Sequence, residues 1–227
     1  MLSTVYTKIY TETWNIFKQV PVKNEPYNDL EIPLNSMYIK RASPDSRTYS
    51  VDINNDEKTI TAIVFTSGVF SNWFPCIIKY MDKVFYSTEQ LFMYIKATNL
   101  KYHKDDSKEV IENNEIIAKQ ILTCRCPKEL QKFGRMLLIN IDAWNEDSAE
   151  HLKNCIILKF TQNSYLKEFL DIIYNNKYII VEGKADQNYG CGLDFDPSNP
   201  EHLDSKNWTG KMKLTSIYND AMNEIYK

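Results

Sequence analysis

The chain has 227 residues, of which 43% are hydrophobic and 25% charged, which is typical of a globular protein with a sizeable core. Its formal net charge of −3 argues against tight, non-specific binding of duplex nucleic acid, because such binding needs a basic surface. No apolar run approaches the ~18 residues of a membrane span, and no secretory signal is visible, so we expect no membrane association and a cytoplasmic location.

The first 60 residues differ in pattern from the rest of the chain. Short strand-like pieces are interrupted by prolines, and these pieces lie at residues 37–40, 49–53 and 59–65. Residues 54–57 are typical of a turn between two strands. No catalytic pattern occurs here. We therefore expect residues 1–60 to form a β-rich N-terminal extension of unknown role, with an unknown protein partner, and residues 61–227 to form the main domain.

From residue 87 the hydrophobic period changes to that of helices. Ser87 to Gln90 matches a capping box, in which the serine accepts from a backbone amide and the glutamine reaches back. Further helices are expected at about 107–122, 127–134, 144–160, 164–174 and 210–225, and a strand at 177–182. These elements predict an α+β fold, a mostly helical single domain with a small β-sheet.

The helix that begins at Thr88 carries an acid and an amine on one side. Glu89 and Lys96 are seven residues apart, close to two turns, so they project from nearly the same face about 10 Å apart along the axis. Phe92 lies between them. Each residue alone also has an ordinary interpretation, since a first-turn acid is stabilised by the helix dipole and most lysines are solvated. Together they predict the wall of a small polar pocket.

The cysteines and histidines do not form a metal pattern. Cys124 and Cys126 are too close for a C-x-x-C zinc knuckle, and no second pair or histidine cluster accompanies them. We expect free thiols, no metal site and no cofactor.

Six short patterns follow one another along the chain. They are Phe70-Ser71-Asn72-Trp73, Thr88 to Phe92 with Lys96, Gly134-Arg135 followed by Trp144, Lys159-Phe160, Glu182 with Asp186, Gly190 and Gly192, and Asn207 with Gly210. In this order they resemble the YbiA-like family, also called NADAR for its proposed link to NAD and ADP-ribose metabolism. The resemblance covers about residues 65–223 and implies a YbiA-like fold. Gln90, Leu91 and Tyr189 depart from the family pattern, which leaves the substrate more open than the reaction type.

The resemblance implies an N-glycosidase that hydrolyses the bond between ribose C1 and a nitrogen. Carboxylates that flank such a bond can divide acid, base and cation-stabilising roles. Glu89 would orient a water or bind ribose hydroxyls, and Asp186 would stabilise the developing cation or assist the leaving base. Lys96 would either bind a phosphate or form a Schiff base with an opened ribose. These three are the candidate catalytic residues.

The resemblance also implies a set of substrate-binding residues. Arg135 suits a phosphate, Trp144 and Tyr189 could stack on a base, and Asn72 could donate or accept an oriented hydrogen bond. The full candidate set is Asn72, Trp73, Phe92, Arg135, Trp144, Tyr189, Gly190 and Asn207.

Three functions remain open from the sequence. The first is removal of ADP-ribose from guanine in a nucleotide or in single-stranded nucleic acid. The second is hydrolysis of a phosphoribosylaminopyrimidine, a reactive intermediate of the riboflavin pathway. The third is a non-enzymatic sensor that binds ADP-ribose or NAD without turnover.

Overall fold

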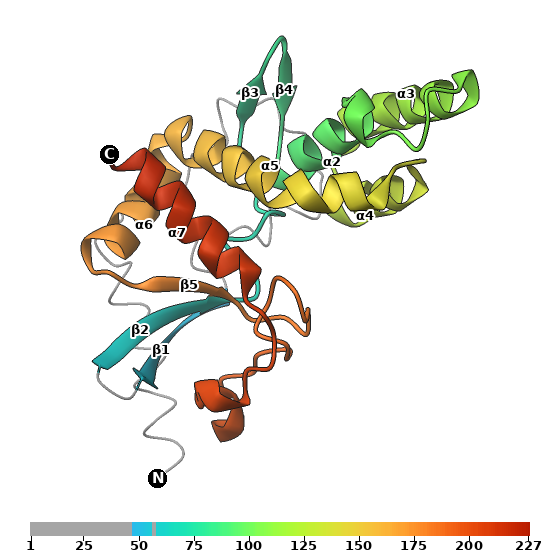
Figure 1. The fold of residues 1–227 in the computed structure, drawn as a ribbon. Coiled ribbons are helices and arrows are strands. Elements are labelled where there is room, and N and C mark those ends of the chain that lie inside the picture. Colours follow the sequence, from blue (N-terminus) through green and yellow to red (C-terminus); the bar gives the residue numbers. More distant parts are fainter. Residues whose placement is uncertain (1–46, 56–57) are drawn as a thin grey trace.

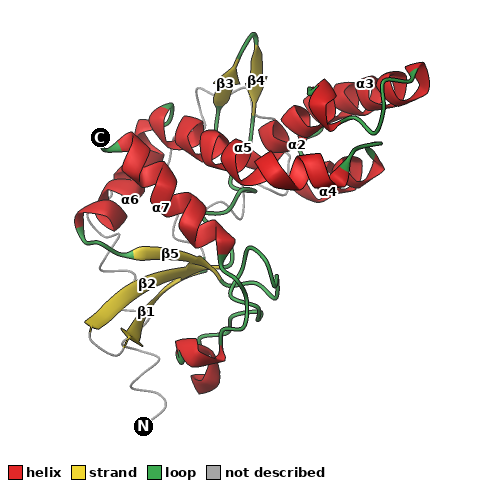
Figure 2. Cartoon of the chain, in the orientation of Figure 1, coloured by secondary structure: helices red, strands yellow, loops and turns green. Residues whose placement is uncertain are grey.

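A computed structural model describes residues 47–55 and 58–227. Helix α5 (Ile141–Thr161) crosses the middle of the molecule (Figure 1). Beside one end of it lie α2 (Thr88–Thr98), α3 (Lys108–Thr123) and α4 (Pro127–Met136). Between it and a three-stranded sheet lie α6 (Ser164–Asn175) and α7 (Lys213–Ile225). A short β3–β4 hairpin extends away from this body (Figure 2). The predicted α+β, mostly helical class is confirmed.

The main sheet has the strand order β1-β2-β5. Its strands are β1 (Thr48–Asn55), β2 (Lys58–Phe65) and β5 (Ile179–Glu182), and the separate hairpin consists of β3 (Ile78–Tyr80) and β4 (Lys83–Phe85). β1 pairs with β2 antiparallel, while β5 pairs with β2 in parallel, with Val64 opposite Val181. The predicted strands at 49–53, 59–65 and 177–182 are confirmed, although the last begins two residues later.

The N-terminal extension shares this sheet. The expected boundary at residue 60 falls inside β2, and β1 is hydrogen-bonded to β2 along its whole length. The predicted strand at 37–40 lies outside the described residues, so the division of the chain at residue 60 stays a prediction.

Strand β2 is buried on both faces, as expected for a central strand between two layers of core. Ile63 and Phe65 face the main core with α5 and α7, whereas Ala62 and Val64 face a smaller core that contains Trp208. Within the described part of the chain, no helix has the length and apolar character needed to cross a membrane.

The helices begin and end close to the expected positions. They are α2 (Thr88–Thr98), α3 (Lys108–Thr123), α4 (Pro127–Met136), α5 (Ile141–Thr161), α6 (Ser164–Asn175) and α7 (Lys213–Ile225), with short 3₁₀ turns η2 (Leu100–Tyr102), η3 (Pro200–Leu203) and η4 (Ser205–Asn207). One predicted end was wrong, because α4 continues through Gly134 to Met136. A side chain at Gly134 would collide with the sulfur of Met93, so this glycine allows α4 to approach α2 closely.

The start of α2 confirms half of the predicted capping box. The Ser87 hydroxyl accepts from the backbone N–H of Gln90 at 3.1 Å. The Gln90 side chain accepts from Tyr86 N at 2.8 Å, and its amide group donates to the carbonyl of Ile121 at 2.8 Å. Gln90 therefore ties the start of α2 to the end of α3, which a local capping pattern cannot reveal.

The loop after β5 crosses the segment before α7 at very short range. A side chain at Gly210 would meet the backbone N of Gly192 at 2.6 Å, and Gly192 has a positive φ of 86°. Backbone bonds from Lys213 N to Asn188 O and from Leu214 N to Tyr189 O join the two segments at 3.0 and 3.3 Å. This crossing fixes the loop that carries Asp186 and Tyr189.

Candidate functional site

A cavity of about 490 Å³ lies where the loop after β2, the start of α2, α4 and the loop after β5 meet. Its lining residues are Thr66, Ser71, Asn72, Trp73, Glu89, Phe92, Met93, Gln131, Leu152, Glu182, Lys184, Asp186, Tyr189 and Leu214. The volume is within the usual range for a small-molecule site. Six of the predicted site residues are among these, and they come from three distant segments of the sequence.

Glu89 is the most deeply buried carboxylate of the cavity, with 6% of its surface exposed. It lies in the first turn of α2, and its backbone N–H donates to Asn72 O at 2.9 Å. Burial, reinforced by the charge of Glu182, raises the pKa of Glu89 to about 7, although hydrogen bonds from Trp73 and Gln131 and the charge of Lys96 favour its ionised form. Near neutral pH this group can therefore either give or take a proton.

Glu182, at the end of β5, is a second acid with a raised pKa. Burial raises its pKa to about 7, the charge of Asp186 adds to this, and Lys184 opposes it. Glu182 belongs to one of the six sequence patterns, but no role was predicted for it. The signal that points to it is an apolar strand that ends in a carboxylate, followed four residues later by Asp186.

Asp186 is exposed and reaches the cavity from the loop after β5. Its Oδ1 accepts from the backbone N–H groups of Asn188 at 2.7 Å and Tyr189 at 2.8 Å. These bonds form an Asx-type turn, so the residue shapes the loop as well as lining the cavity.

Lys96 lies beside the cavity and is not one of its lining residues. Its ammonium group donates to Gly134 O at 3.1 Å and lies 5.5 Å from the centre of the Trp144 ring. Burial lowers the pKa of Lys96, while the charge of Glu89 opposes this shift. The expected pairing of Glu89 and Lys96 on one side of α2 is thus present as an electrostatic interaction.

Trp144 supports the cavity wall from behind. Phe92 lines the cavity, and its ring lies 4.9 Å from that of Trp144, which is only 7% exposed. On its other side Trp144 stacks on His151, with ring centres 5.9 Å apart and planes inclined by 11°. The structure therefore places Trp144 in a packed layer and not on the cavity surface.

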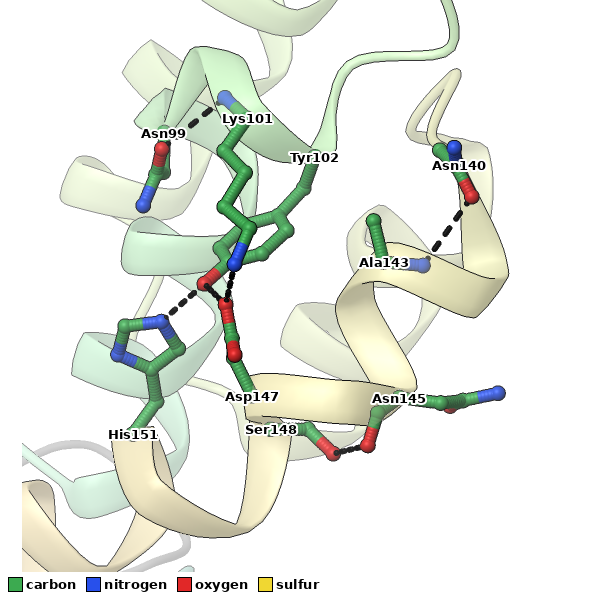
Figure 3. A network of polar contacts seen from close by, with 9 residues as sticks. All are labelled: Asn99, Lys101, Tyr102, Asn140, Ala143, Asn145, Asp147, Ser148 and His151. Atoms are coloured by element: carbon green, nitrogen blue, oxygen red, sulfur yellow. Dashed lines mark hydrogen bonds and ion pairs between the residues drawn. The ribbon is translucent and has the colours of Figure 1, made fainter.

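A cluster of polar side chains, drawn in Figure 3, contacts Trp144 through the rings of Tyr102 and His151. We call Lys101, Tyr102, Asp147 and His151 the Tyr102 cluster. The Tyr102 hydroxyl donates to Asp147 at 2.8 Å and also contacts His151, while Lys101 forms an ion pair with Asp147. Burial, with the neighbouring Asp147 adding to it, raises the pKa of Tyr102 to about 12. The cluster joins η2 to α5.

Besides Trp144, three further predicted binding residues lie away from the cavity lining. Arg135 is exposed on the last turn of α4. Gly190 is buried at the loop crossing, where a side chain would meet Lys184 O at 2.6 Å. The Asn207 side chain donates to Glu201 O at 2.8 Å. Conversely, Gln131 and Lys184 line the cavity but were not predicted from the sequence, because neither belongs to a recognisable local pattern.

Asn72 presents an unsatisfied acceptor. Its Oδ1 is buried and has no hydrogen-bond partner among the described residues. Buried polar atoms are nearly always paired, so this unpaired acceptor on a residue that lines the cavity is an exception to the rule. In the described ranges, no group of three His, Cys, Asp or Glu side chains is arranged to hold a metal ion.

Comparisons with known proteins bear on the fold and family of the chain. The family model of the NADAR domain matches residues 62–224, which is well over half of the chain. The NMR structure of the E. coli protein YbiA is similar in fold, with a TM-score of 0.51 and 18% sequence identity. The match covers 72% of this chain and 84% of that chain, which confirms the expected YbiA-like fold. Among curated proteins, none is similar enough to count as a relative.

Proposed function

Because the chain belongs to the NADAR family, we propose that it is an N-glycosidase that hydrolyses the ribose C1–N bond of an ADP-ribosyl or phosphoribosyl substrate. The observation that carries the proposal is the convergence of Glu89, Glu182 and Asp186 on one cavity. Cleavage of an N-ribosyl bond develops positive charge on the sugar, which carboxylates beside it can stabilise. Plain packing would not bring three acids together.

The two buried acids support a division of labour. Each charge raises the cost of ionising a neighbouring acid, so Glu89 and Glu182 favour a state in which one is protonated and the other ionised near neutral pH. In our proposal one carboxylate activates a water or holds the ribose hydroxyls while the other supplies a proton toward the leaving base. Asp186, which is exposed, faces the developing cation.

Lys96 acts in this proposal by favouring ionised Glu89. Its contact with Gly134 O and its place beside the cavity are consistent with an electrostatic role. The lowered pKa of Lys96 is also what a Schiff-base route would need. Reduction with borohydride during turnover distinguishes the two, since only the covalent route leaves a mass increase on Lys96.

ADP-ribose on guanine is the substrate that we propose first. Trp73, 36% exposed, and the half-buried Tyr189 offer ring surfaces at the cavity for a base. Among the described lining residues Lys184 is the only cation, and it provides a point charge for a phosphate. A single lining cation also fits the phosphoribosyl group of an aminopyrimidine, which is the second candidate substrate.

The test is mass spectrometry of products after incubation with an ADP-ribosylated guanine oligonucleotide. Wild-type protein should release free ADP-ribose, and Glu89→Gln should not. Glu109→Gln is the matched control, because Glu109 is also a first-turn acid but lies exposed on α3. Release by wild type and by Glu89→Gln alike would remove Glu89 from the mechanism. If wild type releases nothing, the aminopyrimidine is tested next, and binding of ADP-ribose without any turnover would identify a sensor.

A further inference from the structure

The loop between β2 and β3 delivers three residues to the cavity wall, namely Ser71, Asn72 and Trp73. Its own backbone bonds are few, and they run from Ser71 N to Gly68 O at 3.0 Å and from Phe74 N to Ser71 O at 3.1 Å. Such short bends do not by themselves determine where the loop lies relative to Glu89. Contacts with the rest of the protein must do so.

Four consecutive carbonyls of this loop are held by other elements. Those of Val69 and Ser71 accept from the ammonium group of Lys159 on α5, the latter at 3.0 Å. The carbonyl of Phe70 accepts from the Tyr218 hydroxyl on α7 at 2.6 Å. The fourth carbonyl, that of Asn72, accepts from the N–H of Glu89 in α2, as described above.

Lys159 is unusual among these anchors because it is a completely buried cation, with 0% of its surface exposed. Its ammonium lies 5.6 Å from the centre of the Phe74 ring and 5.2 Å from that of Phe160. Among the described residues no carboxylate forms a salt bridge with it, and Cys76 is the group whose charge favours its ionised form. Burial lowers the pKa of Lys159 to about 8.

A buried cation without a carboxylate partner is costly, because no opposite charge offsets its loss of hydration. A methionine at this place would fill most of the same volume without that cost. What the lysine adds is a group that can donate to two loop carbonyls at once, two residues apart. Lys159 is not among the residues that line the cavity, so its effect there is exerted through the loop that it holds.

We propose that Lys159 is a positioning residue, which holds the loop Val69–Trp73 in the conformation that presents Asn72 and Trp73 to Glu89. Both Asn72 and Trp73 interact directly with Glu89. The Trp73 side chain donates to the Glu89 carboxylate, and Asn72 O receives the Glu89 N–H. The positioning itself does not depend on the reaction, whereas its effect on turnover rests on the proposed N-glycosidase function.

The primary test observes Trp73 and not activity. Protein labelled with 5-fluorotryptophan is studied by ¹⁹F NMR, and the Trp73 signal is assigned from its absence in Trp73→Phe. In Lys159→Met, which keeps the apolar stem and removes the donors, the Trp73 signal should shift or broaden while that of Trp208, in the smaller core, stays in place. A folded Lys159→Met protein with the wild-type Trp73 signal would overturn the proposal.

Lys153→Met is the matched control. Lys153 lies on the same helix and forms ion pairs with Glu150 at 2.8 Å and Glu224 at 3.2 Å, away from the loop. Its loss should leave the Trp73 signal unchanged, and an equal shift in both variants would overturn the proposal. If Lys159→Met does not fold, Lys159→Gln replaces it, because glutamine keeps an amide donor. Its shorter side chain cannot hold both carbonyls as the ammonium group does, so the Trp73 signal should still shift or broaden relative to wild type, and an unchanged signal would overturn the proposal.

Turnover provides the second readout. Displacement of a loop by about 1 Å can cost about 100-fold in rate, so Lys159→Met should lose about 100-fold in kcat with KM changed much less. If wild type shows no glycosidase activity, the proposed function fails, but the NMR comparison still decides the role of Lys159. If wild type is active and Lys159→Met equally so, the positioning role is overturned while the proposed function stands.

Discussion

Two polar clusters, the Tyr102 cluster and the acids of the cavity, both adjoin the Phe92–Trp144 layer, and their charged groups are partnered in opposite ways. In the Tyr102 cluster an acid meets an ammonium and a hydroxyl, so its charges and donors are paired (Figure 3). At the cavity, the charge of Glu182 raises the cost of ionising Glu89, the charge of Asp186 raises that of Glu182, and Asn72 has a buried acceptor without a partner among the described residues. Paired groups stabilise a fold, whereas acids whose pKa values are raised at a cavity are typical of a functional site.

The largest expected effect is the loss of activity on substitution of a cavity acid, which substitution in the Tyr102 cluster should not cause. Glu89→Gln should lower kcat/KM by about 10³-fold, because proton transfer by a positioned group contributes on the order of 10²–10⁴. Asp147→Asn, in the Tyr102 cluster, should change kcat/KM by only a few-fold. The measurement is steady-state release of ADP-ribose by both variants. Similar losses of kcat/KM in the two variants would contradict the assignment of the reaction to the cavity and of a structural role to the Tyr102 cluster.

The free energy of unfolding should depend on pH through Glu89, whose pKa is raised in the folded protein. Because the folded-state pKa of Glu89 is raised from 4.5 to about 7, the folded protein binds more protons between these values, and its free energy of unfolding falls as pH rises through this window. Glu89→Gln imitates the protonated acid. At pH 7.5 it should be more stable than wild type by up to about 3 kcal/mol, and this gain should vanish at pH 4. Urea unfolding at both pH values provides the measurement.

Tyr102→Phe should lower the stability of the protein and leave its activity nearly unchanged. It removes the buried hydroxyl that donates to Asp147, so the free energy of unfolding should fall by about 1 kcal/mol. The kcat per folded molecule should stay within a few-fold of wild type. Urea unfolding and activity are measured on the same preparation, and a large loss of kcat at unchanged stability would show that the cluster takes part in turnover.

The smallest expected effect concerns coupling within the cavity. Glu182 contributes to the raised pKa of Glu89, so Glu182→Gln should move the pH at which Glu89 ionises to lower values. If ionised Glu89 is the active form, the rising limb of the kcat/KM profile should move in the same direction. Carbon-13 NMR of the Glu89 carboxyl measures this ionisation independently of activity. An unmoved Glu89 titration would contradict the coupling of the two acids.

The sequence predicted the elements well, because helix periodicity and caps such as Ser87 are local. It also predicted that Glu89, Asp186 and Asn72 belong to one site, through the order of the motifs. What it missed depends on tertiary contacts. The sequence predicted a helix end at Gly134. The reason for a glycine there is the close approach of the Met93 sulfur on α2, a tertiary contact that the local sequence does not reveal.

The missed lining residues follow the same rule. Gln131 and Lys184 reach the cavity only because α4 and the loop after β5 pack against α2 and β2. Trp144 carries an aromatic ring in the expected order of motifs, yet packing against Phe92 and His151 turns it into support for the wall. A residue pattern can name the members of a site, but it cannot tell which of them face the ligand.

The parallel pairing of β2 with β5 has a consequence for how the protein folds. The two strands are separated by more than 110 residues, so their pairing requires the closure of a long chain segment. Contacts of this kind form late and slowly compared with helices and hairpins. Glu89 is in place once α2 forms, but Glu182 joins it only when β5 docks onto β2. The acid pair is therefore assembled in the same step that completes the sheet, and a partly folded chain has no site with which to act.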